Sequence, residues 1–203
     1  SCIDIEGNIY ETVDIGEQEW MAENLKATLF QNGDEIPLAF YQINENQSFD
    51  NNVYGNLYEW HAVNDERNIC PEDWNVPSDE EFIEMEIYLG MDPGETMLDG
   101  EIRGTDEGGK LKALGTIESG DGLWHEPNYG ATNETGFSAI PAGYQWFDGD
   151  ILQNGYVARY WSSFESSDFS AWGRGLMYGE SGIYRTQWDK NAGFSVRCIK
   201  DSQ

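Results

Sequence analysis

Four residues with carboxylate or amide oxygens lie close together in the second half of the chain, at Glu126, Asn128, Asn133 and Glu134. Calcium ions in proteins are bound by carboxylates, amide side chains and backbone carbonyls. Side chains of these types could therefore contribute oxygen ligands to a calcium ion. The sequence has no Asp-x-Asp-x-Asp-Gly segment, so a calcium loop of the EF-hand type is not expected.

A segment rich in aromatic and arginine residues lies between residues 168 and 190. Tryptophan and tyrosine offer flat apolar faces to sugar rings, and together with arginine they are the usual anchors of binding interfaces. The alternative is that at least half of these side chains face the core of the domain. We expect a ligand-binding surface formed by Trp172, Arg174, Tyr178, Tyr184 and Trp188, with Arg185 beside them.

Recognisable catalytic motifs are absent from the sequence. It has no Gly-x-Ser-x-Gly, no His-Glu-x-x-His and no glycine-rich phosphate loop followed by Lys and Ser or Thr. A glycosidase needs two carboxylates about 5–10 Å apart. With 38 acidic residues, however, some pair will lie that close by accident. We therefore predict a protein without enzymatic activity, and an unrecognised hydrolase is the less favoured alternative.

The charge balance is strongly acidic, with 38 Asp and Glu against 11 Lys and Arg and a formal net charge of −27. Such a field repels nucleic acids and anionic lipid surfaces, so neither is expected as a partner. No stretch approaches the roughly 20 apolar residues of a membrane span, so we expect no membrane insertion. The 203 residues, 39% of them hydrophobic, predict one globular domain over residues 1–203.

The cysteines are Cys2, Cys70 and Cys198. They form no Cys-x-x-Cys pair, and only His61 and His125 are available as further ligands, so a structural zinc site is not expected. A bridge between Cys70 and Cys198 would tie the end of the chain to its middle and would indicate an oxidising compartment. Two buried free thiols are the alternative. The remaining Cys2 is compatible with a free thiol, a bond to another chain or a former lipid anchor, and a start without Met is expected for a mature or trimmed chain.

The first part of the chain predicts strands. Polar and apolar residues alternate over 8–15, as in a half-buried strand, and residues 16–19 predict a hairpin turn into a second strand at Trp20. Residues 31–52 are polar and are expected to form a long surface loop.

One helix is clearly indicated. It should begin at Ser78, because Ser78 and Glu81 have the spacing of a capping box, and it should end at Gly90, a residue that favours the left-handed conformation. Its apolar face would contain Phe82, Met85 and Leu89. A second, shorter helix is expected around Leu111 and Leu114.

After about residue 120, short aromatic runs alternate with Gly, Asn, Asp and Ser. This pattern predicts a twisted, loop-rich antiparallel sheet that ends in a strand over 194–199, with a tight hairpin at Asp148-Gly149. Helices and antiparallel strands together predict an α+β domain.

Six segments of the chain are similar, in order, to the motifs of one known family. They are residues 18–25 (QEWMAENL), 69–82 (ICPEDWNVPSDEEF), 108–112 (GGKLK), 130–144 (GATNETGFSAIPAGY), 160–163 (YWSS) and 193–198 (GFSVRC). The chain thereby resembles the Fibrobacter succinogenes major paralogous domain, found mostly in surface and secreted proteins of Bacteroidetes. The resemblance extends from about residue 4 to residue 201. Asp73 stands where the family usually has Gly, and Asn75 where it has His.

The resemblance implies a C-type-lectin-like fold. In that fold two helices flank a small twisted antiparallel sheet, the N- and C-terminal strands pair, and a long-loop region lies on top. A disulfide from near the second helix to the last strand is typical of it, which suits Cys70 and Cys198. The formylglycine-generating enzymes of this fold use a pair of active-site cysteines, and that pair is missing here if the bridge forms, because only Cys2 remains.

The lectin resemblance also bears on the calcium site. Glu126-Pro127-Asn128 is similar to the Glu-Pro-Asn triplet that binds calcium and mannose-type sugars in animal C-type lectins. The Trp-Asn-Asp triplet of those lectins has only a distant analogue, Trp188-Asp189-Lys190, with a lysine where a ligand should be. The alternative is that the Glu-Pro-Asn triplet comes from the family's own motif and binds no metal.

Three functions follow as hypotheses. The first is a secreted or surface binding and adhesion module, outside the cell or at the outer membrane, with a glycan or a surface protein as its partner and calcium as its cofactor. The second is a structural subunit of a surface filament or outer-membrane assembly that associates with itself. The third is the hydrolase already mentioned.

Overall fold

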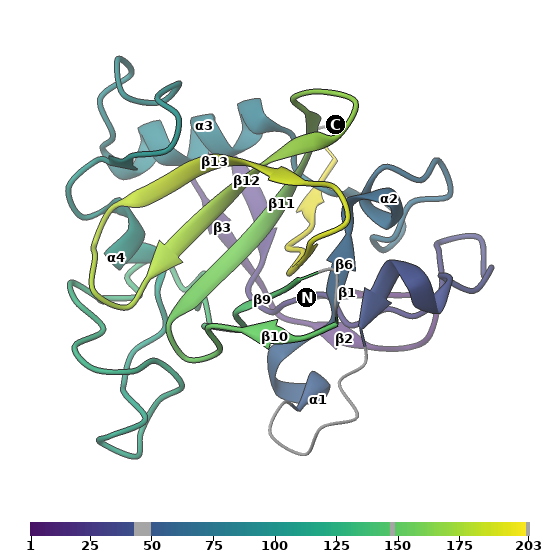
Figure 1. The fold of residues 1–203 in the computed structure, drawn as a ribbon, viewed down its shortest axis with the longest axis horizontal. Helices are drawn as coiled ribbons and strands as arrows, with labels where there is room; N and C mark the ends of the chain where they lie inside the picture. The colour runs from purple at the N-terminus through teal and green to yellow at the C-terminus, as the bar shows by residue number, and fades with distance from the viewer. Residues whose placement is uncertain (43–49, 147–148, 202–203) are drawn as a thin grey trace.

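The computed structural model describes residues 1–42, 50–146 and 149–201. In this part of the chain the strands form four small antiparallel sheets, and most helices are only one or two turns long (Figure 1). The two-stranded sheet is β1 (Cys2–Ile3) with β2 (Ile9–Tyr10). A four-stranded sheet has the order β3 (Thr12–Ile15), β4 (Gln18–Met21), β15 (Ile199–Lys200), β7 (Trp74–Asn75).

The other two sheets contain the later strands. The five-stranded sheet has the order β10 (Ile151–Leu152), β9 (Tyr144–Gln145), β14 (Gly193–Phe194), β6 (Leu57–Glu59), β5 (Tyr41–Gln42). The second four-stranded sheet has the order β11 (Val157–Glu165), β12 (Ser170–Met177), β13 (Ile183–Asp189), β8 (Ile102–Arg103). The helices are η1 (Leu38–Phe40, a 3-10 helix), α1 (Asn51–Tyr54), α2 (Trp60–Val63), α3 (Asp79–Leu89) and α4 (Glu107–Leu111).

This architecture corrects the expected fold. The prediction of a C-type-lectin-like α+β domain with two helices flanking one sheet is wrong, because the described residues are mostly β and are divided among four sheets. The expected second helix around Leu111 and Leu114 is replaced by α4, which ends at Leu111. Two residues of α4, Gly108 and Gly109, lie so close to the carbonyls of Gly182 and Gly130 that a Cβ at either position would be 2.1 Å from oxygen. Glycine is a poor helix former, so this close packing limits α4 to about one turn.

The predicted long helix is confirmed as α3. Ser78 and Glu81 form the capping box in both directions, and Gly90 ends the helix with a φ of 117°. The helix packs on the β11–β12–β13 sheet (Figure 1), and Phe82 and Met85 lie in the same buried cluster as Tyr160. None of the helices in the described ranges is long and apolar enough to cross a membrane.

The predicted N-terminal hairpin is also confirmed, with Val13 opposite the fully buried Trp20 in β3 and β4. The strand expected over 194–199 is instead divided between two sheets, as β14 and β15. Between them, Ser195 exchanges backbone hydrogen bonds with β11, which turns the chain from one sheet to the other. The expected loop over 31–52 contains η1 and β5, and its residues 43–49 lie outside the described residues, as does Asp148 of the predicted tight hairpin.

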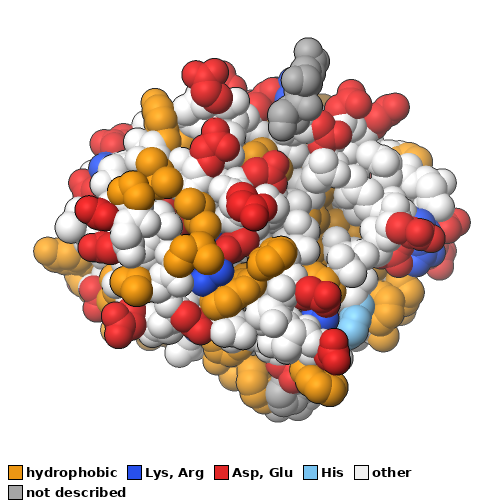
Figure 2. All heavy atoms as spheres, turned by 90° about the horizontal axis from the view of Figure 1, so that it is seen from above, with side chains coloured by type: hydrophobic (Ala, Val, Ile, Leu, Met, Phe, Trp, Pro, Cys, Tyr) orange, Lys and Arg blue, Asp and Glu red, His pale blue; other side chains and the backbone are white. Residues whose placement is uncertain are grey.

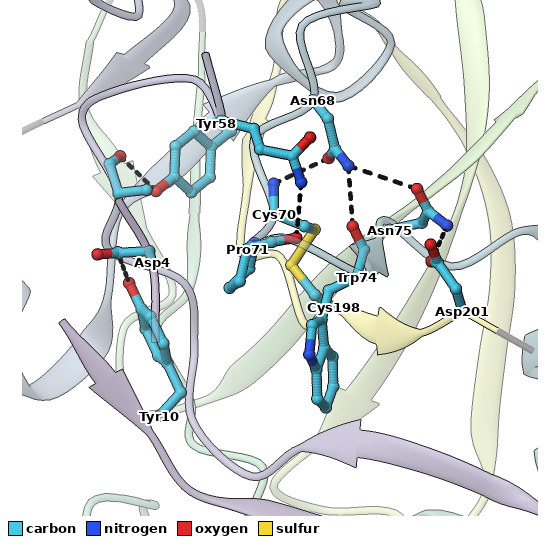
Figure 3. Close-up of a disulfide and its surroundings, with 12 residues drawn as sticks. Asp4, Tyr10, Tyr58, Asn68, Cys70, Pro71, Trp74, Asn75, Cys198 and Asp201 are labelled. Atoms are coloured by element: carbon cyan, nitrogen blue, oxygen red, sulfur yellow. Dashed lines mark hydrogen bonds between the residues drawn. A yellow bond between two sulfur atoms is a disulfide. The ribbon is translucent and has the colours of Figure 1, made fainter. Parts of the chain in front are cut away.

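The predicted disulfide is confirmed between Cys70 and Cys198, which are 128 residues apart in sequence (Figure 3). Asn68 organises the chain next to it, because its Oδ1 accepts from the Cys70 N–H at 2.9 Å and its Nδ2 donates to the Trp74 carbonyl at 2.8 Å. The strand after Cys198, β15, pairs with β4 on one side and β7 on the other. The bridge and the pairing together fix the end of the chain to the N-terminal hairpin.

A buried lysine from the GGKLK segment holds several loops together. The Nζ of Lys112 donates to the carbonyls of Tyr129 at 2.8 Å, Met177 at 3.1 Å and Glu180 at 2.8 Å. Burial lowers the pKa of this ammonium group to about 8. Lys112 therefore connects the loop that contains Asn128 and Asn133 to the end of β12.

Candidate functional site

The β11–β12–β13 sheet divides the residues that the sequence singled out between two faces. Side chains on successive residues of a strand point to opposite faces, and residues paired across an antiparallel ladder point to the same face. Arg174 is opposite Tyr160 and Arg185, so these three side chains point toward α3. Tyr184 and Trp188 have the opposite parity to Arg185 on β13 and therefore point away from α3. The sequence placed these residues in one ligand surface, and the structure separates them.

The inner face carries a buried network of charges. Arg174 is 3% exposed, and its guanidinium lies 2.7 Å from Asp79 Oδ1 and 2.6 Å from Glu86 Oε1. Arg185 pairs with Asp79 at 2.7 Å, and Arg103 pairs with Glu86 at 2.7 Å. The paired arginines hold the pKa of Asp79 below its usual range although burial of the carboxyl opposes this. Arg174 is thus sequestered in ion pairs and does not contribute to an exposed ligand surface.

Trp172 also lies on this inner side. The guanidinium of Arg185 is 3.5 Å from the centroid of the Trp172 ring, a stacked cation–π contact. The indole is half-buried. Because it contacts Arg185, Trp172 lies at the edge of the charge network.

The outer face carries an aromatic cluster around Arg159. The guanidinium carbon of Arg159 lies 4.1 Å from the centroid of Trp188, 5.0 Å from Tyr144 and 5.8 Å from Phe194. The Trp146 ring lies 6.4 Å from both Tyr144 and Trp188, nearly perpendicular to each. We call these five residues, which come from β9, the residue after β9, β11, β13 and β14, the Arg159 cluster.

Tyr184 borders this cluster. Tyr184 is paired with Gly175, and Gly175 is paired with Arg159. Because Gly175 has no side chain, no side chain of β12 separates Tyr184 from Arg159. Burial raises the pKa of the Tyr184 phenol above its usual range. Of the five predicted ligand residues, Tyr184 and Trp188 are therefore the two that lie beside Arg159 on the outer face.

Tyr178 belongs to a different group of rings. It contacts Tyr156 edge to face at 5.1 Å, and Tyr156 in turn stacks on His125 at 4.2 Å. His125 Nδ1 lies 2.6 Å from Glu118 Oε1. This second group lies where the loop that follows Trp124 meets the end of β12.

The four predicted calcium ligands have separate environments. Asn133 is bonded within its own turn, because its Oδ1 accepts from the Ser138 N–H and its Nδ2 donates to the Ser138 hydroxyl, both at 2.9 Å. The Nδ2 of Asn128 donates to the carbonyls of Ala113 and Gly115, while its Oδ1 is buried without a partner. Glu126 and Glu134 are exposed. In residues 1–42, 50–146 and 149–201, no group of three or more His, Cys, Asp or Glu side chains is arranged to hold a metal ion. Calcium also accepts amide and backbone carbonyl oxygens, so its binding near these residues stays a prediction.

Four residues of the Arg159 cluster were not predicted as ligand residues from sequence, namely Tyr144, Trp146, Arg159 and Phe194. The alternation of Tyr144 and Trp146 about Gln145 is a signal that both rings lie on one side of the chain. The position of Arg159 beside them depends on β9, β11 and β14 meeting, which the sequence pattern does not reveal. Phe194 is 1% exposed and forms the floor of the cluster.

The fold and the site define a class of disulfide-bonded protein that is built from small antiparallel sheets and presents an arginine-centred aromatic cluster on one sheet face. Comparison with known families identifies the family of this chain. The chain belongs to the Fibrobacter succinogenes major domain family, whose model matches residues 13–200. No curated protein and no solved structure matches the chain.

Proposed function

We propose that this domain is a non-catalytic binding module that takes a glycan at the Arg159 cluster. The observation that supports this is the grouping of Tyr144, Trp146 and Trp188, whose ring centroids lie 5.6–6.4 Å apart. All three side chains keep part of their surface in solvent. Aromatic rings with one face supported by the protein and another part exposed suit stacking on a sugar ring, because they bury apolar area without much loss of side-chain entropy.

The proposed setting is the cell surface or the extracellular medium. A disulfide between residues 128 positions apart supports an oxidising compartment. Acidic side chains are scattered over the face seen in Figure 2, with few lysines or arginines between them. A surface of this kind is compatible with a soluble exposed domain and argues against anionic partners that bind by charge alone.

A glycan array tests this function directly. The folded protein should bind a restricted set of glycans, and Trp146→Ala should weaken binding at least about tenfold, a loss in the range of one stacking or interface anchor. Tyr88→Ala is the matched control, because Tyr88 is 65% exposed on α3, on the other side of the β11–β12–β13 sheet from the cluster. Binding that survives Trp146→Ala and Trp188→Ala, in proteins shown to be folded, would overturn the assignment.

The same array, repeated with calcium and with a chelator, tests the metal. If calcium takes part, removing it should lower glycan binding, and Glu126→Gln should have the same effect. If binding is unchanged by the chelator, the Arg159 cluster binds without calcium.

A role in a surface assembly is a second candidate, favoured by one specific observation. Ile3, Ile5 and Ile9 are 59%, 55% and 61% exposed on or beside the two-stranded β1–β2 sheet, next to a cavity of about 470 Å³ that extends to Cys70. A second copy of the chain is the occupant we consider, since Cys2 lies in β1 and is a free thiol in this structure. Size-exclusion chromatography with and without reductant, on the parent and on Ile9→Ser, should show a dimer that the substitution removes.

A further inference from the structure

Arg159 differs from the other arginines in having no polar partner among the described residues. Arg67, Arg103, Arg174 and Arg185 each pair with a carboxylate, and Arg197 donates to backbone carbonyls and to Asn24. The Nε of Arg159 is buried without any hydrogen-bond acceptor. An unpaired guanidinium is conspicuous in a chain with 38 acidic residues, because carboxylates are abundant and an unsatisfied buried donor is costly.

The position of Arg159 leaves its terminal nitrogens available. Only Nε is among the buried atoms without a partner, so Nη1 and Nη2 are not sealed off in the way that Nε is. A Cβ built at Gly175, the residue opposite, would lie 3.7 Å from Nη1, so the guanidinium extends over a position that has no side chain. The guanidinium carbon lies over the rings of Trp188 and Tyr144, 4.1 Å and 5.0 Å from their centroids, and these contacts hold the group in place. The side chain is therefore preorganised while part of its hydrogen-bonding capacity is unused.

Arg159 also lies in a partly desolvated environment. Burial lowers its pKa to about 10, and the phenols of Tyr144 and Tyr184 oppose this shift. Although the whole chain has a charge of −27, no carboxylate in residues 1–42, 50–146 and 149–201 is among the groups that shift the pKa of this guanidinium.

We propose that Arg159 binds the carboxylate of an acidic sugar, a hexuronic acid residue, whose ring lies against Trp146 and Trp188. The planar fork of a guanidinium matches a carboxylate with two parallel hydrogen bonds, and this partner would supply the counter-charge that the described residues do not. The inference depends on the proposed glycan-binding function and makes it more specific. A carboxylate alone would suit a peptide equally well, and the adjoining half-exposed rings favour a sugar.

The test compares a short oligogalacturonate with the same oligomer after methyl esterification, by isothermal titration calorimetry at about 0.15 M salt, where the long-range repulsion of the acidic surface is screened beyond roughly 8 Å. The parent should bind the acid form at least about tenfold more tightly than the ester, the range of charge-assisted hydrogen bonds. Arg159→Met should remove this preference and leave binding of the ester unchanged. Arg159→Lys should retain part of it, since a lysine keeps the charge without the fork.

Arg67→Met is the matched control, because it removes one positive charge from a surface pair with Asp65 and Asp34. It should leave the acid preference intact. Equal binding of acid and ester by the parent would overturn the inference, as would an Arg159→Met variant that loses both ligands equally. An acidic peptide that binds as tightly as the oligogalacturonate would overturn the choice of a sugar. If the ester binds in a manner sensitive to Trp146→Ala without any acid preference, the glycan-binding function stands and only the inference about Arg159 fails.

Discussion

Arg159 and Arg174 lie on neighbouring strands, one residue out of register, and point to opposite faces of the same sheet. Arg174 is opposite Tyr160, and Arg159 is opposite Gly175. The side chain of Arg174 lies between Asp79 and Glu86, whereas that of Arg159 lies between the rings of Trp188 and Tyr144. One sheet therefore holds a neutralised guanidinium on its inner face and an unpaired one on its outer face.

The inner network should be essential for stability. Glu86 is fully buried and accepts from both Arg103 and Arg174, so Glu86→Gln leaves two buried guanidiniums without this anionic partner. The expected cost is about 3–5 kcal/mol in the free energy of unfolding, measured by urea denaturation. Glu84→Gln on the exposed side of the same helix is the control and should change stability by less than about 0.5 kcal/mol. Similar small effects for both variants would show that the network is not needed.

The disulfide should contribute a comparable amount. Cys70 and Cys198 close a loop with a sequence separation of 128 residues. In the chain-entropy model a loop of this length stabilises the folded state by about 4–5 kcal/mol. The double variant Cys70→Ala, Cys198→Ala should therefore show a correspondingly lower free energy of unfolding in urea. Cys2→Ala, which removes the free thiol, should have a much smaller effect, and an equal loss in the two variants would contradict the assigned role of the bridge.

The sequence predicted correctly those helices and hairpins that are determined by residues close together in the chain. The capping box at Ser78 and the glycine at 90 define α3, and the alternation around Val13 and Trp20 defines the first hairpin. The division of residues 193–200 between two sheets depends on Ser195 bonding to β11, which is a contact distant in sequence. No periodicity within the segment could reveal it. The expectation of two flanking helices is wrong for a similar reason, because Gly108 and Gly109 are required by loops that approach from residues 130 and 182.

The candidate site was predictable only as a region. The aromatic content of residues 168–190 indicated binding residues, but the register of β12 and β13 decides which of them point outward. Arginine and tryptophan are both common interface anchors. Arg174 nevertheless pairs with buried carboxylates, whereas Trp188 borders solvent. Tyr144 and Arg159 join Trp188 through contacts between strands that are distant in sequence.

Lys112 should hold the loop that contains Asn128 and Asn133 in place. In Lys112→Met, the carbonyls of Tyr129, Met177 and Glu180 lose a shared donor, and a buried acceptor without a partner is costly. We expect a loss of about 3 kcal/mol and faster hydrogen exchange at the Tyr129 amide, which donates to the Tyr178 carbonyl. Lys200→Met, which breaks a pair with Glu19 in which the lysine side chain is 45% exposed, is the control and should cost less than about 1 kcal/mol. The assignment is wrong if the Tyr129 amide exchanges at the same rate in the parent and in Lys112→Met.

Glu59 should make stability depend on pH near neutrality. Burial of its carboxyl, and next the repulsion from Asp189, raise its pKa from 4.5 to about 7. A carboxyl with a raised pKa contributes stability that is fully present below its unfolded-state pKa and is lost as the pH rises through about 7. Because the side chain keeps some contact with solvent, we expect this loss to be about 1–2 kcal/mol rather than the full linkage value.

Glu59→Gln separates this local effect from the repulsion among all acidic side chains. The glutamine stays neutral, so the variant should match the parent near pH 4 and be more stable than it by about 1–2 kcal/mol at pH 8, measured by urea denaturation across that range. Glu84→Gln removes an equal charge at an exposed position and reports only the general repulsion, which should be small at about 0.15 M salt. If the two variants gain the same stability at pH 8, the pH dependence comes from net charge. If Glu59→Gln gains more stability at pH 8 than Glu84→Gln does, the pH dependence comes from the carboxyl of Glu59 beside Asp189.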